Sequence, residues 1–289
     1  MKTMTTSDIS SLLKKSASFA LQWRLLLLWV LVLLVPTFII TLPLWRIISL
    51  QLNHSVLAGE FAQHLNMNAI NDIISVMVDN KLLLQEAGVG ALILTLLLSP
   101  LLSGAIITAA RSPTSLPIGK LIHGGMTEYW RMFRMLICAL IPFGIAGAIG
   151  SGVMHLADNY GEQAILQSDA EFASHAATAV MIILLVIADA TLDAGRAQFI
   201  NHANRCSVII AWWRGLKLIV TRPLQTLGVY VAITLIGLIA AAVLALLRLK
   251  IGHIHLPGFI LGLVLTQLLV VSLAWIKTAR LFGLAAVSK

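Results

Sequence analysis

Long apolar runs alternate with shorter polar connections along this chain. Six runs come close to the roughly 20 residues that a helix needs to cross the hydrocarbon core of a bilayer. Because lipid offers no partners to backbone N–H and C=O groups, we expect each run to be a helix. The pattern predicts one all-α, polytopic integral membrane bundle over residues 1–289. The predicted spans are residues 25–45, 87–110, 135–155, 176–195, 225–247 and 257–277.

Four prolines lie in the interior of these predicted spans. Each removes a backbone hydrogen-bond donor and crowds the preceding turn, so each is an expected kink site. They are Pro36 and Pro43 in the first span, Pro100 in the second and Pro142 in the third.

Charged residues are sorted by sign between the connections. Sixteen of the 20 Lys and Arg residues lie in the N-terminal segment 1–24, the second and fourth connections and the C-terminal tail. Acidic residues collect in the first and third connections. By the positive-inside rule, both termini are predicted to be cytoplasmic. The fifth connection, with Arg248 and Lys250, is the one local exception.

The composition supports a lipid environment. Hydrophobic residues make up 59% of the chain and charged residues 11%, with a mean hydropathy of +0.94, which excludes an ordinary soluble domain. A net charge of +8 would suggest nucleic acid in a soluble protein. Here Lys and Arg flank apolar spans, where anionic lipid headgroups attract them. We therefore expect a lipid bilayer with anionic headgroups as a partner, and no nucleic acid.

Several connections have the pattern of amphipathic helices. Residues 118–135 and 206–220 interleave apolar and basic residues and carry aromatic pairs, as helices in the headgroup plane do. The N-terminal segment, with apolar residues from Ile9 to Trp23 at spacings of three and four, repeats this pattern. Residues 57–78 predict one or two short helices on the opposite side.

A faint internal repeat relates two parts of the chain. The segment from Gly104 to Arg111 closes the second span as the segment from Asp189 to Arg196 closes the fourth, and a Trp-Arg pair follows each. The pattern predicts tandem units over residues 87–155 and 176–247, related by an axis along the membrane normal. Chance similarity between apolar segments is the alternative.

Small residues recur every three to four positions in three spans. Such spacing lets helix backbones approach closely in lipid, where apolar burial drives little association. Packing within the chain is the favoured interpretation, and a homo-oligomer is the alternative. The residues are Gly144, Ala148 and Gly152 in the third span, Gly237, Ala241 and Ala245 in the fifth, and Gly258 and Gly262 in the sixth.

The sharpest polar feature is the inner end of the fourth span. Asp189 and Asp193 lie one turn apart on one helical face, and Arg196 follows three residues later. A carboxylate at the centre of a membrane helix costs about 2.5 to 3.5 kcal/mol on insertion scales, so both should face the bundle and pair with residues such as Arg111 or Arg196. The functional hypothesis is a proton or cation relay, or an anchor for a cationic substrate. The structural hypothesis, which we favour, is an ion-pair cluster that holds the two repeats together.

Gln267, midway along the sixth span, is a further intramembrane polar group. A glutamine at this depth hydrogen-bonds across helices for about 0.6 kcal/mol on average. The candidate intramembrane polar cluster therefore comprises Asp189, Asp193, Arg196, Arg111 and Gln267.

Signatures of catalysis and of cofactor binding are absent from the sequence. It contains no nucleophile elbow, no His-Glu-x-x-His, no P-loop and no kinase set. Six histidines lie in the predicted outer connections, but none has an established metal-ligand spacing. We expect no enzyme, no catalytic residue, no metal and no cofactor. The histidines are His54, His64, His155, His175, His253 and His255.

A family resemblance follows from the Ala-Ala-Arg111 and Ala-Gly-Arg196 endings, the Trp-Arg pairs and Arg222-Pro223 before a new span. In these features the chain resembles six-span bacterial inner-membrane proteins related to the membrane domain attached to some glycerophosphodiester phosphodiesterases. The likeness covers about residues 20–285. The soluble phosphodiesterase domain is missing from this sequence, so that activity does not carry over. The resemblance implies a multi-pass protein of the bacterial plasma (inner) membrane.

Two functional hypotheses follow. The first is a non-enzymatic membrane factor that aids assembly, envelope organisation or export and binds a membrane or periplasmic protein; it needs only the bundle, the interfacial helices and the outer segment. The alternative is a secondary transporter or permease that uses Asp189 and Asp193 as a proton or cation site. The aspartates lie toward the inner edge and inverted repeats are missing, so the first hypothesis is favoured.

Overall fold

The fold consists of helices. The computed structural model describes residues 14, 16–52, 67–112, 114–164, 166–201, 207–251 and 256–288. Within these ranges every regular element is a helix and no strand occurs. Six helices of the described residues are long and apolar enough to cross a membrane. The protein is therefore an all-α, polytopic helical bundle, as the apolar pattern predicts.

The six spanning helices contain the six predicted spans. Each helix extends past its apolar run, because backbone hydrogen bonding continues where the side chains become polar. The third crossing is built from two consecutive helices. The helices are α2 (Trp23–Leu52), α5 (Lys81–Arg111), α7 (Tyr129–Cys138) with α8 (Leu140–Gln163), α9 (Gln167–Asn201), α11 (Pro223–Lys250) and α12 (Leu256–Val287).

One of the predicted kink sites coincides with a helix break. α7 ends at Cys138 and α8 begins at Leu140. Pro142 lies four residues after Cys138, so its ring crowds that carbonyl and its missing N–H cannot donate to it. Pro36, Pro43 and Pro100 lie inside the continuous helices α2 and α5.

In the described parts of the connections there are three shorter helices: α4 (Met67–Asp79), α6 (Ile118–Thr127) and α10 (Val208–Thr221). α6 with α7, and α10, correspond to the two segments predicted as amphipathic helices. α4 corresponds to part of the predicted segment 57–78, whose residues 57–66 lie outside the described residues. The predicted N-terminal helix is described only from residue 14 onward, where residues 16–19 are helical.

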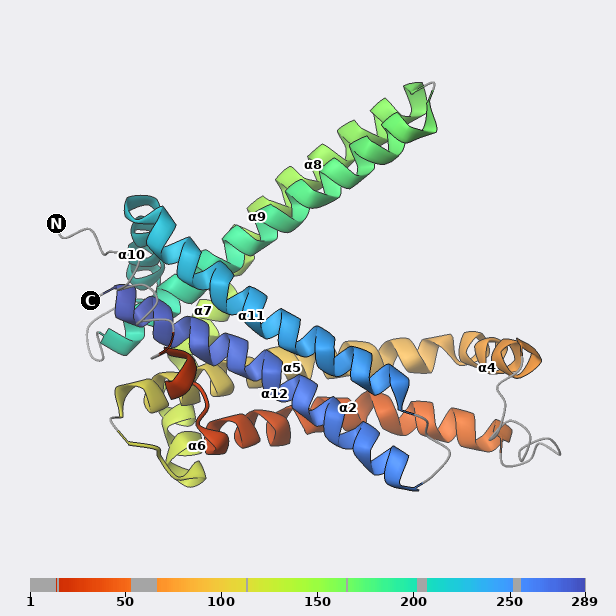
Figure 1. Ribbon diagram of the computed structural model, residues 1–289, viewed down its shortest axis with the longest axis horizontal. Helices are drawn as coiled ribbons and strands as arrows, with labels where there is room; N and C mark the ends of the chain where they lie inside the picture. The colour runs from red at the N-terminus through yellow and green to blue at the C-terminus, as the bar shows by residue number, and fades with distance from the viewer. Residues whose placement is uncertain are drawn as a thin grey trace.

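Burial is concentrated at one end of the molecule. Figure 1 shows the start of α2, the ends of α5, α9 and α12 and the start of α11 at this end, together with α6, α7 and α10. We call this end the junction; it comprises residues 16–28, 102–111, 118–139, 188–201, 208–233 and 274–287. Its core side chains have no exposed surface; they include Ile107, Leu121, Met135, Leu192, Phe199 and Leu281.

Close helix crossings at the junction depend on glycine pairs. A Cβ on Gly104 would lie 2.9 Å from the Gly125 carbonyl oxygen, where α5 crosses α6. A Cβ on Gly215 would lie 2.4 Å from the Gly195 backbone nitrogen, where α10 crosses α9. Each long helix thus packs against the amphipathic helix that follows it. The predicted repeat aligns residues 104–111 with residues 189–196, so Gly104 corresponds to Asp189 and not to Gly195. The two glycine crossings therefore do not occupy equivalent positions of the repeat, which stays a prediction.

The remaining part of α8 and α9 projects away from the other spans. Figure 1 shows these two helices packed on each other as a hairpin that diverges from α2, α5, α11 and α12. We call residues 140–187 the arm. Gly150 of α8 faces Met181 of α9, whose sulfur would lie 1.9 Å from an added Cβ. Large apolar side chains of the arm are exposed, as expected for a surface in lipid.

Candidate functional site: a buried aspartate network

The C-terminal half of α9 carries the two aspartates toward α11 and α12. Around them the helix is rich in small residues: Ala188, Ala190, Ala194, Gly195 and Ala197. Small side chains let neighbouring helices approach closely, which encloses the carboxylates. Asp193 has no exposed surface, and the side chain of Asp189 is 28% exposed.

Asp193 is paired with three cations. Lys277 Nζ lies 2.7 Å from its Oδ1, and Arg196 Nη1 lies 2.8 Å from the same oxygen. Arg280 Nε lies 3.5 Å from Oδ2. These contacts offset the desolvation that burial of a carboxylate costs.

Asp189 shares two of these cations and a phenol. Tyr230 donates a hydrogen bond to Oδ2 over 2.6 Å, and Arg280 Nη1 lies 3.0 Å from the same oxygen. Lys277 Nζ lies 3.5 Å from Oδ1. The Arg280 guanidinium also donates to the Tyr230 hydroxyl and lies 4.5 Å from the centre of its ring. The phenol therefore fixes the orientation of the arginine that bridges both carboxylates.

We call these six residues the aspartate network: Asp189, Asp193, Arg196, Tyr230, Lys277 and Arg280. Three cations and two carboxylates leave one excess positive charge. Both carboxylates are ion-paired, although Asp193 Oδ2 and Arg280 Nε, which lie 3.5 Å apart, make no hydrogen bond. The arrangement joins α9, α11 and α12 by buried ion pairs and hydrogen bonds.

The predicted partner Arg111 belongs to a separate cluster. Its Nη1 lies 2.7 Å from Glu128 Oε1, and its Nη2 donates to the Phe199 carbonyl over 2.6 Å. Arg131 Nη1 lies 3.1 Å from the other Glu128 oxygen, and its guanidinium lies 4.9 Å from the centre of the Phe199 ring. The expected pairing of Arg111 with the aspartates is therefore wrong. Its carboxylate partner is Glu128, the residue between α6 and α7.

Gln267 is the other residue of the predicted polar cluster that lies apart from the aspartates. It lies on α12, ten residues before Lys277. At 1.5 Å per residue this separation is about 15 Å along the helix. Gln267 is thus half-buried in the span but is not part of the aspartate network.

Three members of the network were not anticipated. The sequence predicts that Lys277 and Arg280 belong to a cytoplasmic tail, because the apolar run ends near residue 277, whereas α12 continues to Val287. Their spacing of three is a signal in the sequence, since positions three apart share a helical face just as positions four apart do. Tyr230 offers no comparable signal, because a tyrosine in an apolar span is ordinary until its neighbours are known.

Candidate metal ligands are scattered in the described part of the chain. There, no group of three or more His, Cys, Asp or Glu side chains is arranged to hold a metal ion. His155 and His175 are exposed on the arm, while His54, His64, His253 and His255 lie outside the described residues. Cys138 is half-buried at the end of α7, and Cys206 lies outside the described residues.

Comparison of the chain with protein-family models, curated proteins and solved structures gives no match. The relation to phosphodiesterase-associated membrane domains therefore stays a prediction. The geometry of the arm and of the junction carries the functional argument.

Proposed function

We propose that this chain is a non-enzymatic, multi-pass protein of the bacterial inner membrane with both termini in the cytoplasm. Its role is that of an accessory factor in assembly, envelope organisation or export. It acts by binding a transmembrane helix of another protein along the arm. The observation that carries this proposal is an uncovered row of small residues on α8.

The row lies on the side of α8 that faces away from α9. Ala146 and Gly150 are buried against α9. Gly144, Ala148 and Gly152 lie on the opposite side and are exposed. A Cβ added at Gly144 or Gly152 would meet no atom within 4 Å. Small residues four apart permit close backbone contact with another helix, so this face fits a helix that the chain itself does not supply.

The other predicted rows of small residues are used within the chain. A Cβ on Gly237 of α11 would lie 2.1 Å from Ile276 of α12, and Ala241 is 8% exposed. A Cβ on Gly262 of α12 would lie 3.0 Å from the Arg248 guanidinium carbon. The contrast with α8 supports an external partner at the arm.

The charge distribution supports the orientation. The junction gathers basic residues from the second and fourth connections and the end of α12, where anionic headgroups of the inner leaflet attract Lys and Arg. These residues include Lys120, Arg131, Arg134, Arg214, Lys217 and Arg222. On this basis the junction is cytoplasmic and the arm crosses toward the periplasm.

The junction provides a fixed base for the arm. The aspartate network ties the inner half of α9 to α11 and α12, and Arg111 ties α5 to the Phe199 carbonyl near the end of α9. A rigid base and an uncovered arm suit a protein that holds a partner in place.

A secondary transporter that uses Asp189 and Asp193 is the alternative. The partial exposure of Asp189 favours it, whereas the pairing of both carboxylates with three cations favours a structural role. Proton-coupled uptake or efflux by the purified protein in liposomes, lost in Asp189→Asn while the fold is retained, would support transport.

The proposed function is tested by site-specific photo-crosslinking in native membranes. A crosslinker at Ala148 is expected to form one reproducible adduct with a different membrane protein, and the adduct should disappear in Gly152→Leu. A crosslinker at Ile149, which is 50% exposed on an adjacent face, is the control and should react with lipid alone. Adducts at both positions in equal yield, or none at Ala148, would contradict the proposal.

A further inference from the structure

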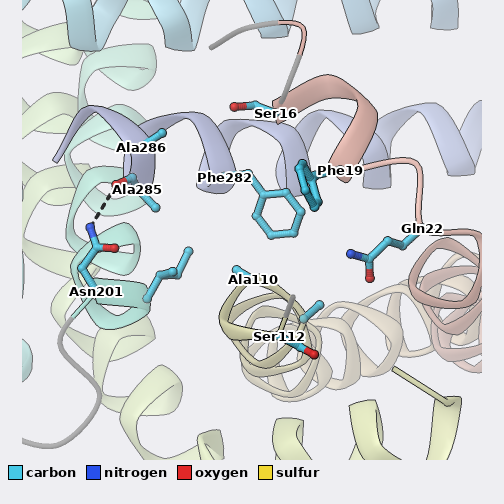
Figure 2. A pocket seen from close by; sticks show the side chains of 11 residues that line it. Ser16, Phe19, Gln22, Ala110, Ser112, Asn201, Phe282, Ala285 and Ala286 are labelled. Carbon is cyan, nitrogen blue, oxygen red and sulfur yellow. Dashed lines mark hydrogen bonds between the residues drawn. The ribbon is translucent and has the colours of Figure 1, made fainter. Parts of the chain in front are cut away.

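A pocket opens at the junction, separate from the aspartate network. It has a volume of about 340 Å³ and lies where the ends of α5, α9 and α12 meet the turn before α2 (Figure 2). This volume is within the range of small-molecule sites, roughly 300 to 1,000 Å³. No member of the aspartate network lines it.

Three helix C-termini surround this pocket: α5 ends at Arg111, α9 at Asn201 and α12 at Val287. A helix C-terminus carries a partial negative charge of about half an elementary charge, which favours a cation nearby. The last turns of α9 and α12 contain no basic residue. Arg111, in the last turn of α5, also donates to the Phe199 carbonyl in the last turn of α9, so among the described residues the α12 C-terminus is the end without a cation. The described lining residues carry no charged side chain.

Asn201 presents a hydrogen-bond acceptor to the pocket. Its Nδ2 donates to the Ala285 carbonyl over 2.9 Å and to Ser288 Oγ over 2.7 Å. A carbonyl can only accept, so this contact fixes the orientation of the amide. Figure 2 shows the Asn201 side-chain oxygen directed into the pocket. The ligand that suits this oxygen is a hydrogen-bond donor.

Two aromatic rings form part of the wall. Phe19, Phe282 and Gln22 are among the residues that line the pocket (Figure 2). The face of an aromatic ring attracts cations. Phe19 and Trp23 are 47% and 64% exposed, as is typical of aromatic residues at the level of the lipid headgroups.

We propose that this pocket binds the primary ammonium group of a zwitterionic phospholipid headgroup of the ethanolamine type. The ammonium donates to Asn201 Oδ1, lies against the rings of Phe19 and Phe282, and is stabilised by the C-terminus of α12, whose last turn holds no basic residue. We assign the source to a lipid because the pocket lies at the ends of three helices long and apolar enough to span a membrane. This inference is independent of the partner site on the arm.

The test is selective lipid retention. The full chain is delipidated, reconstituted into bilayers of equal parts ethanolamine and glycerol phospholipids, and extracted for native mass spectrometry. The ethanolamine lipid is expected to be enriched about fivefold among bound lipids, the effect of one added cation–π contact. Equal retention, or preference for the anionic glycerol lipid, would overturn the proposal.

Variants at Gln22 test the sign of the charge that the pocket prefers. Gln22→Lys places a tethered ammonium beside the pocket and should abolish the enrichment, whereas Gln22→Glu should increase it. The opposite order would show that an anion binds there. Soluble ethanolamine at the same concentration is expected not to compete, and displacement by it would overturn the assignment to a lipid.

A filling variant tests the location. Ala286→Phe occupies the pocket and should return lipid retention to an equal ratio. Ala242→Phe adds the same ring to an exposed position of α11 and is the matched control, with wild-type enrichment expected. Undiminished enrichment in Ala286→Phe would place the lipid elsewhere and refute the proposal.

Discussion

The helix α9 passes through two regions of opposite character. In the arm, Ile182 and Ile183 are 55% and 57% exposed, and α9 packs against α8. In the junction, Leu192 and Asp193 have no exposed surface, and helices α10 and α12 pack around them. One continuous helix therefore forms half of a lipid-facing hairpin and also part of a buried core. Stability should therefore depend on the junction, and recognition on the arm.

The largest effect is expected at the most buried charge. Asp193→Asn removes the carboxylate that pairs with Arg196, Lys277 and Arg280 and leaves three cations beside one aspartate. Breaking a buried pair in this way costs about 3 to 5 kcal/mol. Thermal unfolding in detergent should show a marked loss of stability, and little protein should accumulate. The control Asp158→Asn changes an exposed residue of the arm and should unfold like the wild type.

The glycine crossing of α9 and α10 should tolerate no side chain. Gly215→Ala places a Cβ 2.4 Å from the Gly195 nitrogen, which is backbone and cannot move aside. Overpacking of this kind costs about 1 to 3 kcal/mol. Gly147→Ala, on α8, has nothing within 4 Å and is the matched control. Equal unfolding temperatures for the two variants would show that the crossing is looser than described.

A smaller effect is expected from the phenol of the network. Tyr230→Phe removes the hydroxyl that contacts Asp189 and Arg280 but leaves the ring under the guanidinium. Hydrogen bonds to charged groups contribute about 1.5 to 3 kcal/mol, and the retained ion pairs should keep the loss near the lower bound. Chemical denaturation measures it. The control is Tyr160→Phe, which changes an exposed residue of the arm and should leave the denaturation midpoint unchanged. An equally unchanged midpoint for Tyr230→Phe would show that the hydroxyl does not stabilise the fold.

The smallest effect on stability is expected on the outer face of the arm. Ala148→Leu enlarges an exposed side chain that contacts lipid or a partner, so the unfolding temperature should stay within error of the wild type. A destabilisation comparable to that of Gly215→Ala would show that Ala148 packs within the chain. The outer face of the arm would then contribute to stability as the junction does, and the proposed division between the two regions would be wrong.

Much of the fold was accessible from the sequence, since apolar runs of about 20 residues have few alternatives to spanning helices. The site was accessible only in part. Asp189, Asp193 and Arg196 stand on one helix, where spacing determines which side chains are neighbours. Tyr230, Lys277 and Arg280 reach the aspartates from other helices, and no local pattern encodes which face of α11 or α12 meets α9. For the same reason the Glu128 partner of Arg111 was not anticipated.

The central claim is that the junction maintains the fold while the arm binds a partner. The most direct measurement places a photo-crosslinker at Ser151, on the uncovered face of α8, and compares adduct yield per folded molecule with and without Ala148→Leu. We predict at least a tenfold loss of the partner adduct with an unchanged unfolding temperature. An undiminished adduct in the Ala148→Leu background would contradict the claim.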